Sequence, residues 1–230
     1  MKQIAIILAA FIIASYSNAQ VINDESYLDI EFMKFKAELT SCVLAKDTTH
    51  LKRLLADSIK ESNDGCGFIG CPKNEFIEYY FEESANESWQ NMLSIIRFGF
   101  SRINHEYTDS PVPHSSTVFQ GPSYLKKLNE QEQLVVLGEN VNIRKEPGIK
   151  SPIIRKASFE IFSCDCNISD QTDLTYLTVD GIDWVQIKLG ENQVGYVAQE
   201  FTSLEIYKEM TIAKVKGQWK IISFYHSAGC

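Results

Sequence analysis

Three short runs in the second half of the chain alternate apolar with polar residues, and they restrict the fold more than any other feature. In the first run, Val141 and Ile143 alternate with polar residues until Pro147-Gly148 turns the chain. The runs 184–187 and 195–197 follow, separated by a Gly-Glu-Asn turn at 190–192. A period of two over such short lengths is typical of half-buried strands joined by turns. The sequence therefore predicts a small β-structure over about 132–204.

The same runs carry three motifs that occur together, in this order, in one family. They read Asn142-Ile143-Arg144-Lys145-Glu146-Pro147, Trp184-Val185-Gln186-Ile187 and Gly195-Tyr196-Val197. They resemble the bacterial Src-homology-3-like (SH3b) family, which opens with an Asn-Val-Arg-x-x-Pro-like run, carries a Trp-x-x-Val-like strand and closes on Gly-Tyr/Trp-Val. The resemblance implies a small SH3-like β-barrel over 132–204. It also implies peptidoglycan or a peptide-like wall component as a candidate ligand.

Four residues of this region are candidates for ligand binding. Small barrels present a shallow groove of aromatic and loop residues, because aromatic rings give a large contact area with few rotors to order. We predict that Tyr176, Trp184 and Tyr196 line such a groove and that Glu146 faces solvent beside it. The alternative for each ring is that it fills the core, and this alternative is strongest for Trp184. By the family resemblance, Asn142 and Arg144 stabilise the first loop.

The first 19 residues have the pattern of a signal peptide. Lys2 supplies a positive start, an apolar run follows over 4–14, and Ser17-Asn18-Ala19 is a small-x-small cleavage site. The apolar run is short for a membrane span, and no later segment is apolar enough for one. We therefore predict an exported protein, periplasmic or extracellular, with no transmembrane anchor; an uncleaved N-terminal anchor is the alternative.

Apolar residues recur at helical spacing in four segments of the first half. We predict helices that begin near Asp24, Asp47, Lys73 and Asn86, with the second continuing through Ile59. The residues expected to face inward are Leu28, Phe32, Phe35, Leu39, Val43, Leu51, Leu54, Leu55, Ile59, Phe76, Ile77, Tyr80, Trp89, Met92, Leu93 and Ile96. The segment 108–122 is rich in Pro and Ser, which disfavours helix, and is predicted to be a linker or an extended crossover.

The tail carries the pattern of a β-hairpin. Met210 and Ile212 precede Lys216-Gly217, and an alternating run follows from Trp219. Because an isolated hairpin is unstable in water, it must cover another element, and the N-terminal helices offer one. The alternative is two independent domains with a tail that folds on the barrel.

Together these segments predict an α+β fold in which the barrel interrupts a discontinuous domain. Its parts are an N-terminal helical region, 20–125, and the hairpin, 205–230, that completes it. This order of helices, SH3b-like domain and closing Gly217-Gln218-Trp219-Lys220 hairpin is similar to that of exported proteins of the Bacteroidetes type. That similarity implies architecture and compartment but no reaction.

The cysteines suggest structure rather than catalysis. Six cysteines in an exported chain suggest disulfides, and Cys66 and Cys71 flank a Gly-rich loop that could let them meet. Free buried thiols are the alternative. Cys42 lies in an apolar helical stripe and is predicted to be a core residue. Cys164-Asp165-Cys166 offers two thiolates but has no third or fourth ligand nearby, so we predict no metal.

The remaining patterns favour binding over catalysis. The net charge of −8 argues against nucleic acid as a partner. No phosphate-binding Gly-rich loop and no Cys-His amidase signature are present, so we predict no cofactor and no enzyme. We predict a non-enzymatic binding or structural module of the bacterial cell envelope that recognises peptidoglycan, a peptide or an envelope protein.

Two other functions stay open at this point. The first is an accessory or inhibitory protein that binds another protein or a small molecule through the helical half, in a pocket lined by Phe35, Trp89 and Trp219. The second, weaker alternative is a thiol-dependent cell-wall hydrolase. The sequence does not indicate an oligomeric state.

Overall fold

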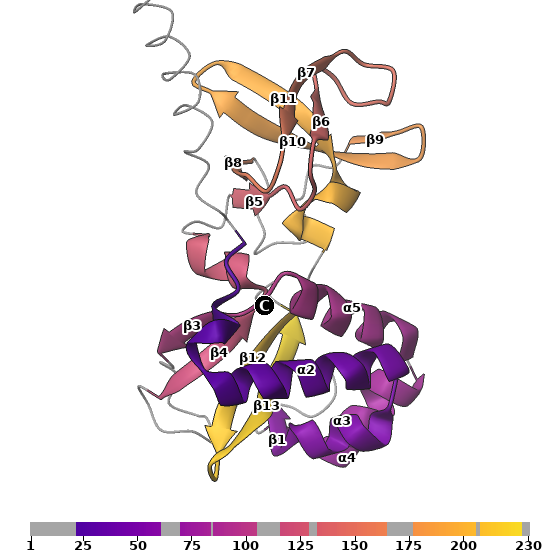
Figure 1. Ribbon diagram of the computed structural model, residues 1–230. Coiled ribbons are helices and arrows are strands. Elements are labelled where there is room, and N and C mark those ends of the chain that lie inside the picture. The colour runs from indigo at the N-terminus through magenta and orange to yellow at the C-terminus, as the bar shows by residue number, and fades with distance from the viewer. Residues whose placement is uncertain are drawn as a thin grey trace, which may run out of the picture.

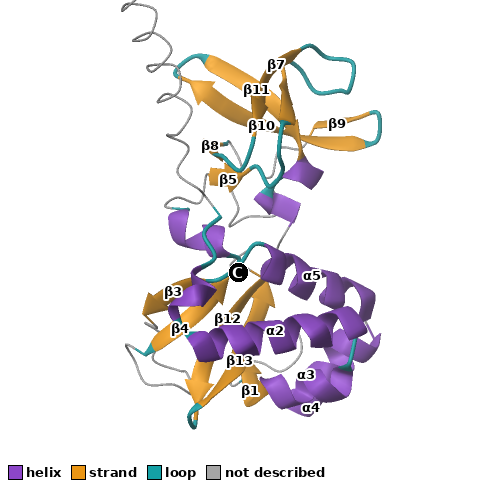
Figure 2. Cartoon of the chain, in the orientation of Figure 1, coloured by secondary structure: helices purple, strands orange, loops and turns teal. Residues whose placement is uncertain are grey.

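The chain forms two lobes, which Figure 1 shows one above the other. The structure is a computed structural model that describes residues 22–60, 70–83, 85–104, 116–128, 133–164, 177–205 and 208–226. The predicted signal peptide, 1–19, lies outside the described residues. Helices and strands are both abundant, and Figure 2 shows that the main helices gather in one lobe while the other is mostly strand. The predicted α+β class is confirmed.

The first lobe contains a six-stranded sheet built from both ends of the chain. Its strand order is β2-β1-β13-β12-β4-β3, with β1 and β13 parallel and the other neighbours antiparallel. The strands are β1 (Leu55–Lys60), β2 (Cys71–Pro72), β3 (Ser101–Asn104), β4 (Thr117–Gly121), β12 (Lys208–Val215) and β13 (Gln218–His226). The predicted C-terminal hairpin is therefore confirmed as β12–β13, and it supplies the two central strands.

Helices cover one face of this sheet (Figure 1). They are η1 (Glu25–Leu28), α2 (Ile30–Ala45), α3 (Thr48–Leu54), α4 (Lys73–Ile77), the π-helical η2 (Glu78–Glu83) and α5 (Ala85–Arg97). Helix α2 begins at Asp29, whose carboxylate accepts the backbone N–H groups of Glu31 and Phe32, and it ends at Lys46 in the left-handed conformation. Its apolar stripe contacts β13, so helices and hairpin share one hydrophobic core.

The prediction of a purely helical region over 20–125 is wrong in part. The second helix stops at Leu54, and the residues expected to extend it form strand β1 instead. Strand β4 occupies the end of the expected linker. Both segments pair with the C-terminal hairpin. The backbone hydrogen bonds gained by β1 override its local helical spacing, while β4 agrees with the alternative of an extended crossover. Leu28 and Leu93, which were expected to face inward, are exposed, while Ile95 is buried.

The second lobe consists of two sheets that enclose one core. A five-stranded sheet has the order β7-β6-β11-β10-β9, and a two-stranded sheet pairs β5 with β8. The strands are β5 (Gln133–Val135), β6 (Val141–Arg144), β7 (Ile153–Ala157), β8 (Ile161–Ser163), β9 (Leu177–Val179), β10 (Ile182–Gly190) and β11 (Gln193–Ala198). The short helices η4 (Gln199–Phe201) and η5 (Ser203–Glu205) follow β11.

The predicted closed barrel is not seen in the described part of the chain, because neither sheet closes on itself. Single bridges, Val136 to Thr202 and Cys164 to Ile187, connect the two sheets. Side chains of both sheets nevertheless pack into one buried cluster. The predicted strand around Trp184 is confirmed as β10, and the predicted turn at 190–192 joins β10 to β11.

A small apolar cluster joins the lobes. Phe98 and Tyr124 of the first lobe are buried together with Val135 of the second. Tyr124 lies on η3 (Ser123–Lys127), and the rings of Phe98 and Tyr124 have centroids 6.0 Å apart. Ser123 Oγ donates to the Phe98 carbonyl at 2.6 Å. The junction is therefore packed rather than a bare linker.

Replacing Gly195 tests the core of the second lobe. A Cβ at this position would lie 2.6 Å from Ile143 Cγ2 and 3.0 Å from Leu189 Cδ1. We expect Gly195→Ala to lower the free energy of unfolding by about 1–3 kcal/mol through overpacking. Gly190→Ala is the matched control, since nothing lies within 4 Å of its Cβ, and it should change stability by about 0.5 kcal/mol or less. Equal midpoints of urea denaturation for the two variants would contradict the packing argument.

Candidate functional site

The predicted aromatic residues Trp184 and Tyr196 lie on adjacent strands and share a sheet face. Trp184 is on β10 opposite Ala198 of β11, and Tyr196 of β11 is opposite Gln186 of β10. Residues two apart on a strand point to the same side, so these side chains line the face opposite to Val185 and Ile187, which lie in the core. The structure thus brings two of the four predicted residues together.

Trp184 is buried, with 3% of its surface exposed, but its polar atom is not satisfied. Its indole Nε1 has no hydrogen-bond partner among the described residues. An unpartnered buried donor costs free energy, and the buried indole Nε1 of Trp219 in the first lobe is in the same state. The burial of Trp184 agrees with the core-filling alternative, and its groove role stays a prediction.

Tyr196 is half-buried and held in a defined orientation. Its hydroxyl donates to Gln186 Oε1 at 3.0 Å. Sequence reasoning did not select Gln186 as a site residue; the available signal was its position two residues after Trp184, on the same strand face. Across the other edge of β11, Tyr196 lies opposite Arg144 of β6. An aromatic ring with a neighbouring amide can contact apolar and amide groups of a ligand.

Glu146 is exposed in the loop after β6, two residues beyond Arg144. Its backbone N–H donates to Ser151 Oγ at 2.9 Å, and Arg144 Nη1 donates to the Ser151 carbonyl at 2.7 Å. Arg144 therefore fixes the loop, the role that the family resemblance implied for it. No hydrogen bond within the described residues joins Glu146 to Trp184 or Tyr196. Tyr176, the fourth predicted residue, lies outside the described residues.

The free thiol of Cys42 is a core group. Cys42 is buried, and its Sγ donates to the Asp47 carbonyl at 3.2 Å. Burial first, and then the charges of Asp47 and Glu38, raise the pKa of this thiol to about 11. A protonated, buried thiol is a poor nucleophile, so Cys42 is unsuited to a hydrolase mechanism.

Alkylation tests this assignment of Cys42. We expect iodoacetamide to modify Cys42 in the folded protein at least about a hundredfold more slowly than in the urea-unfolded chain. Burial limits access of the reagent to the thiol, and the raised pKa lowers the fraction of thiolate. Peptide mass spectrometry after timed quenching measures the rate at this site. Similar rates in both states would show that the thiol is reactive.

Of the other five cysteines, only Cys71 and Cys164 lie within the described residues. Cys71 and Cys164 are disulfide-bonded. Cys66, the predicted partner of Cys71, lies outside the described residues, so that pairing stays a prediction. Within the described ranges no three His, Cys, Asp or Glu side chains gather into a group that could hold a metal. No described helix is both long and apolar enough to cross a membrane.

The pocket predicted among Phe35, Trp89 and Trp219 is instead filled by aromatic packing. All three side chains are buried in the core of the first lobe. The Trp219 ring lies 5.2 Å from Phe32 and 5.4 Å from Phe119, and Trp89 lies 4.6 Å from Phe81. These residues therefore stabilise the lobe and offer no room to a ligand.

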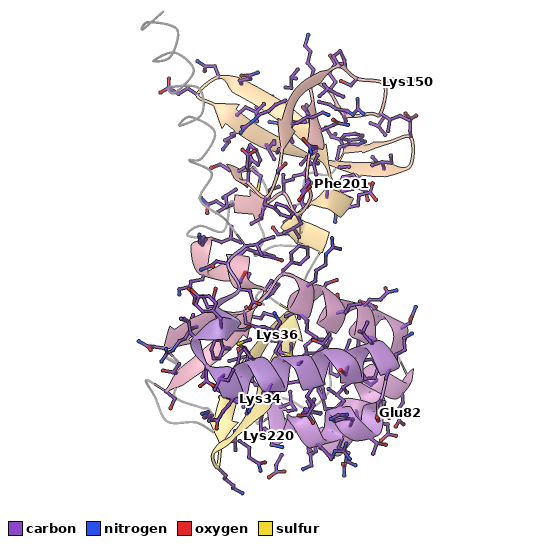
Figure 3. All side chains as sticks on the ribbon, in the orientation of Figure 1. Lys34, Lys36, Glu82, Lys150, Phe201 and Lys220 are labelled. Carbon is purple, nitrogen blue, oxygen red and sulfur yellow. The ribbon has the colours of Figure 1, made fainter. Side chains whose placement is uncertain are left out.

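A shallow depression of about 370 Å³ lies instead on the outside of the first lobe, between η1 and α2. Exposed Tyr27 and Met33 line it, together with Lys36, which Figure 3 labels on α2. Asp24 is at its base and is tied to the fold: it accepts the Phe100 N–H at 3.1 Å and pairs with Lys36. Sequence reasoning selected Asp24 only as a helix cap.

Replacing Asp24 tests this ion pair. Burial alone would raise the pKa of Asp24, but hydrogen bonds from Lys36, Ser26 and Phe100 outweigh it and hold the pKa below the ordinary 3.8. The carboxylate therefore stabilises the folded state fully above pH 3.8, and this contribution is lost as the pH falls below that value. We expect Asp24→Asn to cost about 1–2 kcal/mol at neutral pH and less in acid. Urea denaturation of both proteins across this range measures the difference; a constant gap would contradict it.

No protein-family model, curated protein or solved structure matches this chain in the three comparisons made. The site is therefore interpreted from its own geometry.

Proposed function

We propose that this chain is a non-enzymatic binding or structural module, exported to the bacterial cell envelope, which recognises peptidoglycan or a peptide-like ligand. The observation that carries the proposal is the buried, unpartnered indole N–H of Trp184 on the sheet face that Tyr196 also lines. A ligand carbonyl could accept this N–H, while the tyrosine ring contacts apolar atoms.

The SH3-like character of the second lobe is part of the same proposal. Two sheets that share one core and are joined by single bridges are consistent with an open form of a small β-barrel. The fixed loop after β6 also supports it, because Arg144 and Ser151 hold this loop beside the aromatic face. A fold of this kind does not define a ligand by itself, so binding must be measured.

Co-sedimentation with insoluble peptidoglycan tests the proposal. We expect the mature protein to pellet with the polymer and Tyr196→Ala to weaken pelleting about tenfold, since truncating a contact aromatic removes 1 kcal/mol or more of binding free energy. Tyr79→Ala is the matched control, because Tyr79 is exposed on the first lobe. Absence of pelleting would overturn the choice of ligand. Equal pelleting of both variants would overturn the aromatic face as the site.

A second candidate function rests on the depression of the first lobe. Tyr27 is 66% exposed and Met33 is 43% exposed at its rim, and apolar side chains gathered at a depression are typical of protein contact sites. The chain would then act as an accessory or inhibitory protein. Loss of partner binding in a Tyr27→Ala variant, with peptidoglycan binding unchanged, would favour this second function.

A further inference from the structure

The hairpin formed by β6 and β7 differs in charge from the rest of the chain. Residues 141–157 contain five basic residues and one acidic residue, a net charge of +4, in a chain whose net charge is −8. The rest of the chain therefore sums to −12. Such a local reversal of sign attracts anionic partners to one place on the molecule.

Strand β7 of this hairpin is an uncovered edge. It is the last strand of its sheet and pairs with β6 alone among the described strands. Its first four residues, 153–156, are all exposed, although Arg155 lies over the Phe162 ring and pairs with Glu160. An edge of this kind presents backbone donors and acceptors to which another strand can be added.

Apolar side chains lie at the same edge. Ile153 is 49% exposed and Ile154 is 37% exposed, and Ile149 in the preceding loop is 52% exposed. The register shifts between Ile143 and Arg144, which leaves one extra residue on β7. β-branched residues favour strand pairing, while Lys156 and the bulge disfavour pairing between two copies of this edge.

The basic side chains around these isoleucines select the partner. Lys145, Lys150 and Lys156 are exposed, and no ion pair is found for them within the described residues. Figure 3 labels Lys150 at the far end of the second lobe, away from Lys34 on the first. Two copies of this edge would place like charges opposite each other and repel, but an acidic strand would be attracted.

From these observations we infer that β7 binds an extended polypeptide segment, with alternating apolar and acidic side chains, as an added strand. The backbone of the segment would pair with β7, its apolar side chains would cover the exposed isoleucines, and its carboxylates would face the lysines. In the sheet order β7-β6-β11-β10, strand β7 lies two strands from Tyr196, and Ile153 shares a sheet face with Tyr196 through Arg144. Strand addition uses the free edge of β7 rather than the aromatic face, so the inference does not depend on the proposed function.

Fluorescence anisotropy with designed peptides tests this inference on the full mature chain. The probe is a short labelled peptide of alternating valine and glutamate, and its comparators are the valine–lysine peptide and a backbone N-methylated valine–glutamate peptide. We expect only the unmodified acidic peptide to bind, and added salt to weaken it. Equal binding of the N-methylated peptide would overturn strand addition, because that peptide cannot donate the backbone hydrogen bonds.

Charge reversal provides the matched variants. Lys150→Glu with Lys156→Glu should weaken peptide binding by about tenfold or more. Lys34→Glu with Lys52→Glu changes the net charge equally, at exposed positions of the first lobe, and should leave binding unchanged. Equal loss in both double variants would overturn the assignment to β7, and so would binding to anionic lipid vesicles without any binding of the acidic peptide. Circular dichroism confirms that each variant is folded.

Discussion

A chain that ends at residue 205 will not form the first lobe, although the helices that cover it are all present. The reason is the position of the hairpin in the sheet order β2-β1-β13-β12-β4-β3. Without its two central strands, only the pairs β1–β2 and β3–β4 remain, and isolated two-stranded sheets are marginal in water. The core also loses Ile221, Ile222 and Phe224, which are buried. We expect loss of most helical signal in far-UV circular dichroism and no cooperative unfolding of this lobe.

The converse deletion provides the control. Excising 133–204 and joining the ends with a short flexible Gly-Ser linker keeps every strand of the six-stranded sheet. The two ends of the excised segment lie close together, since the Val135 N–H donates to Ser203 Oγ at 3.0 Å. We expect this chain to fold and unfold cooperatively, with stability reduced because Phe98 and Tyr124 lose the packing of Val135. A folded truncation at 205, or an unfolded excision product, would contradict a discontinuous first lobe.

Phe32→Ala is expected to be among the most destabilising single substitutions in the chain, at about 3–5 kcal/mol. Phe32 is fully buried on α2, and its ring stacks on Phe119 with centroids 3.7 Å apart. It also meets Phe100 at 5.4 Å and Trp219 at 5.2 Å, so one ring connects α2 to β4 and β13. Truncation would leave a cavity among rigid rings that cannot collapse easily. Urea denaturation followed by tryptophan fluorescence measures the loss.

The adjacent residue offers a matched control. Met33 is on the same helix but is 43% exposed, so Met33→Ala should change the free energy of unfolding by about 0.5 kcal/mol or less. Similar losses for the two variants would show that the helix itself, and not the aromatic cluster, limits stability. Since native domains are stable by only about 5–15 kcal/mol, the Phe32 variant should also unfold at a clearly lower temperature.

Local patterns predicted most of the turns and many of the inward residues. The hairpin turn at Lys216-Gly217 has both residues at positive φ, 51° and 80°, as a tight two-residue turn requires. The stripe Phe32, Phe35 and Leu39 is buried as helical spacing predicts. These features depend on neighbours within a few residues, so the sequence contains them directly.

Local patterns failed where a distant strand decided the outcome. Leu55 and Ile59 have helical spacing with Leu51, yet they lie in a strand because Leu55 pairs with Ile221. The candidate site shows the same limit. The choice of Trp184 and Tyr196 came from motifs, but the partner Gln186 and the unpartnered indole N–H follow from pairing across β10 and β11. The uncovered edge of β7 is visible only once the strand order is known.

The sequence by itself therefore determined the elements whose stability is local: the apolar stripe of helix α2, the tight turns and the alternating strands. It placed the start of this helix near Asp24, whereas α2 begins after Asp29. Only the tertiary structure decided which segments pair, that β13 lies between β1 and β12, and that the rings expected to line a pocket fill a core. The physical reason is that backbone donors must be hydrogen-bonded and apolar faces must be buried, but short-range patterns do not specify the distant segment that does either.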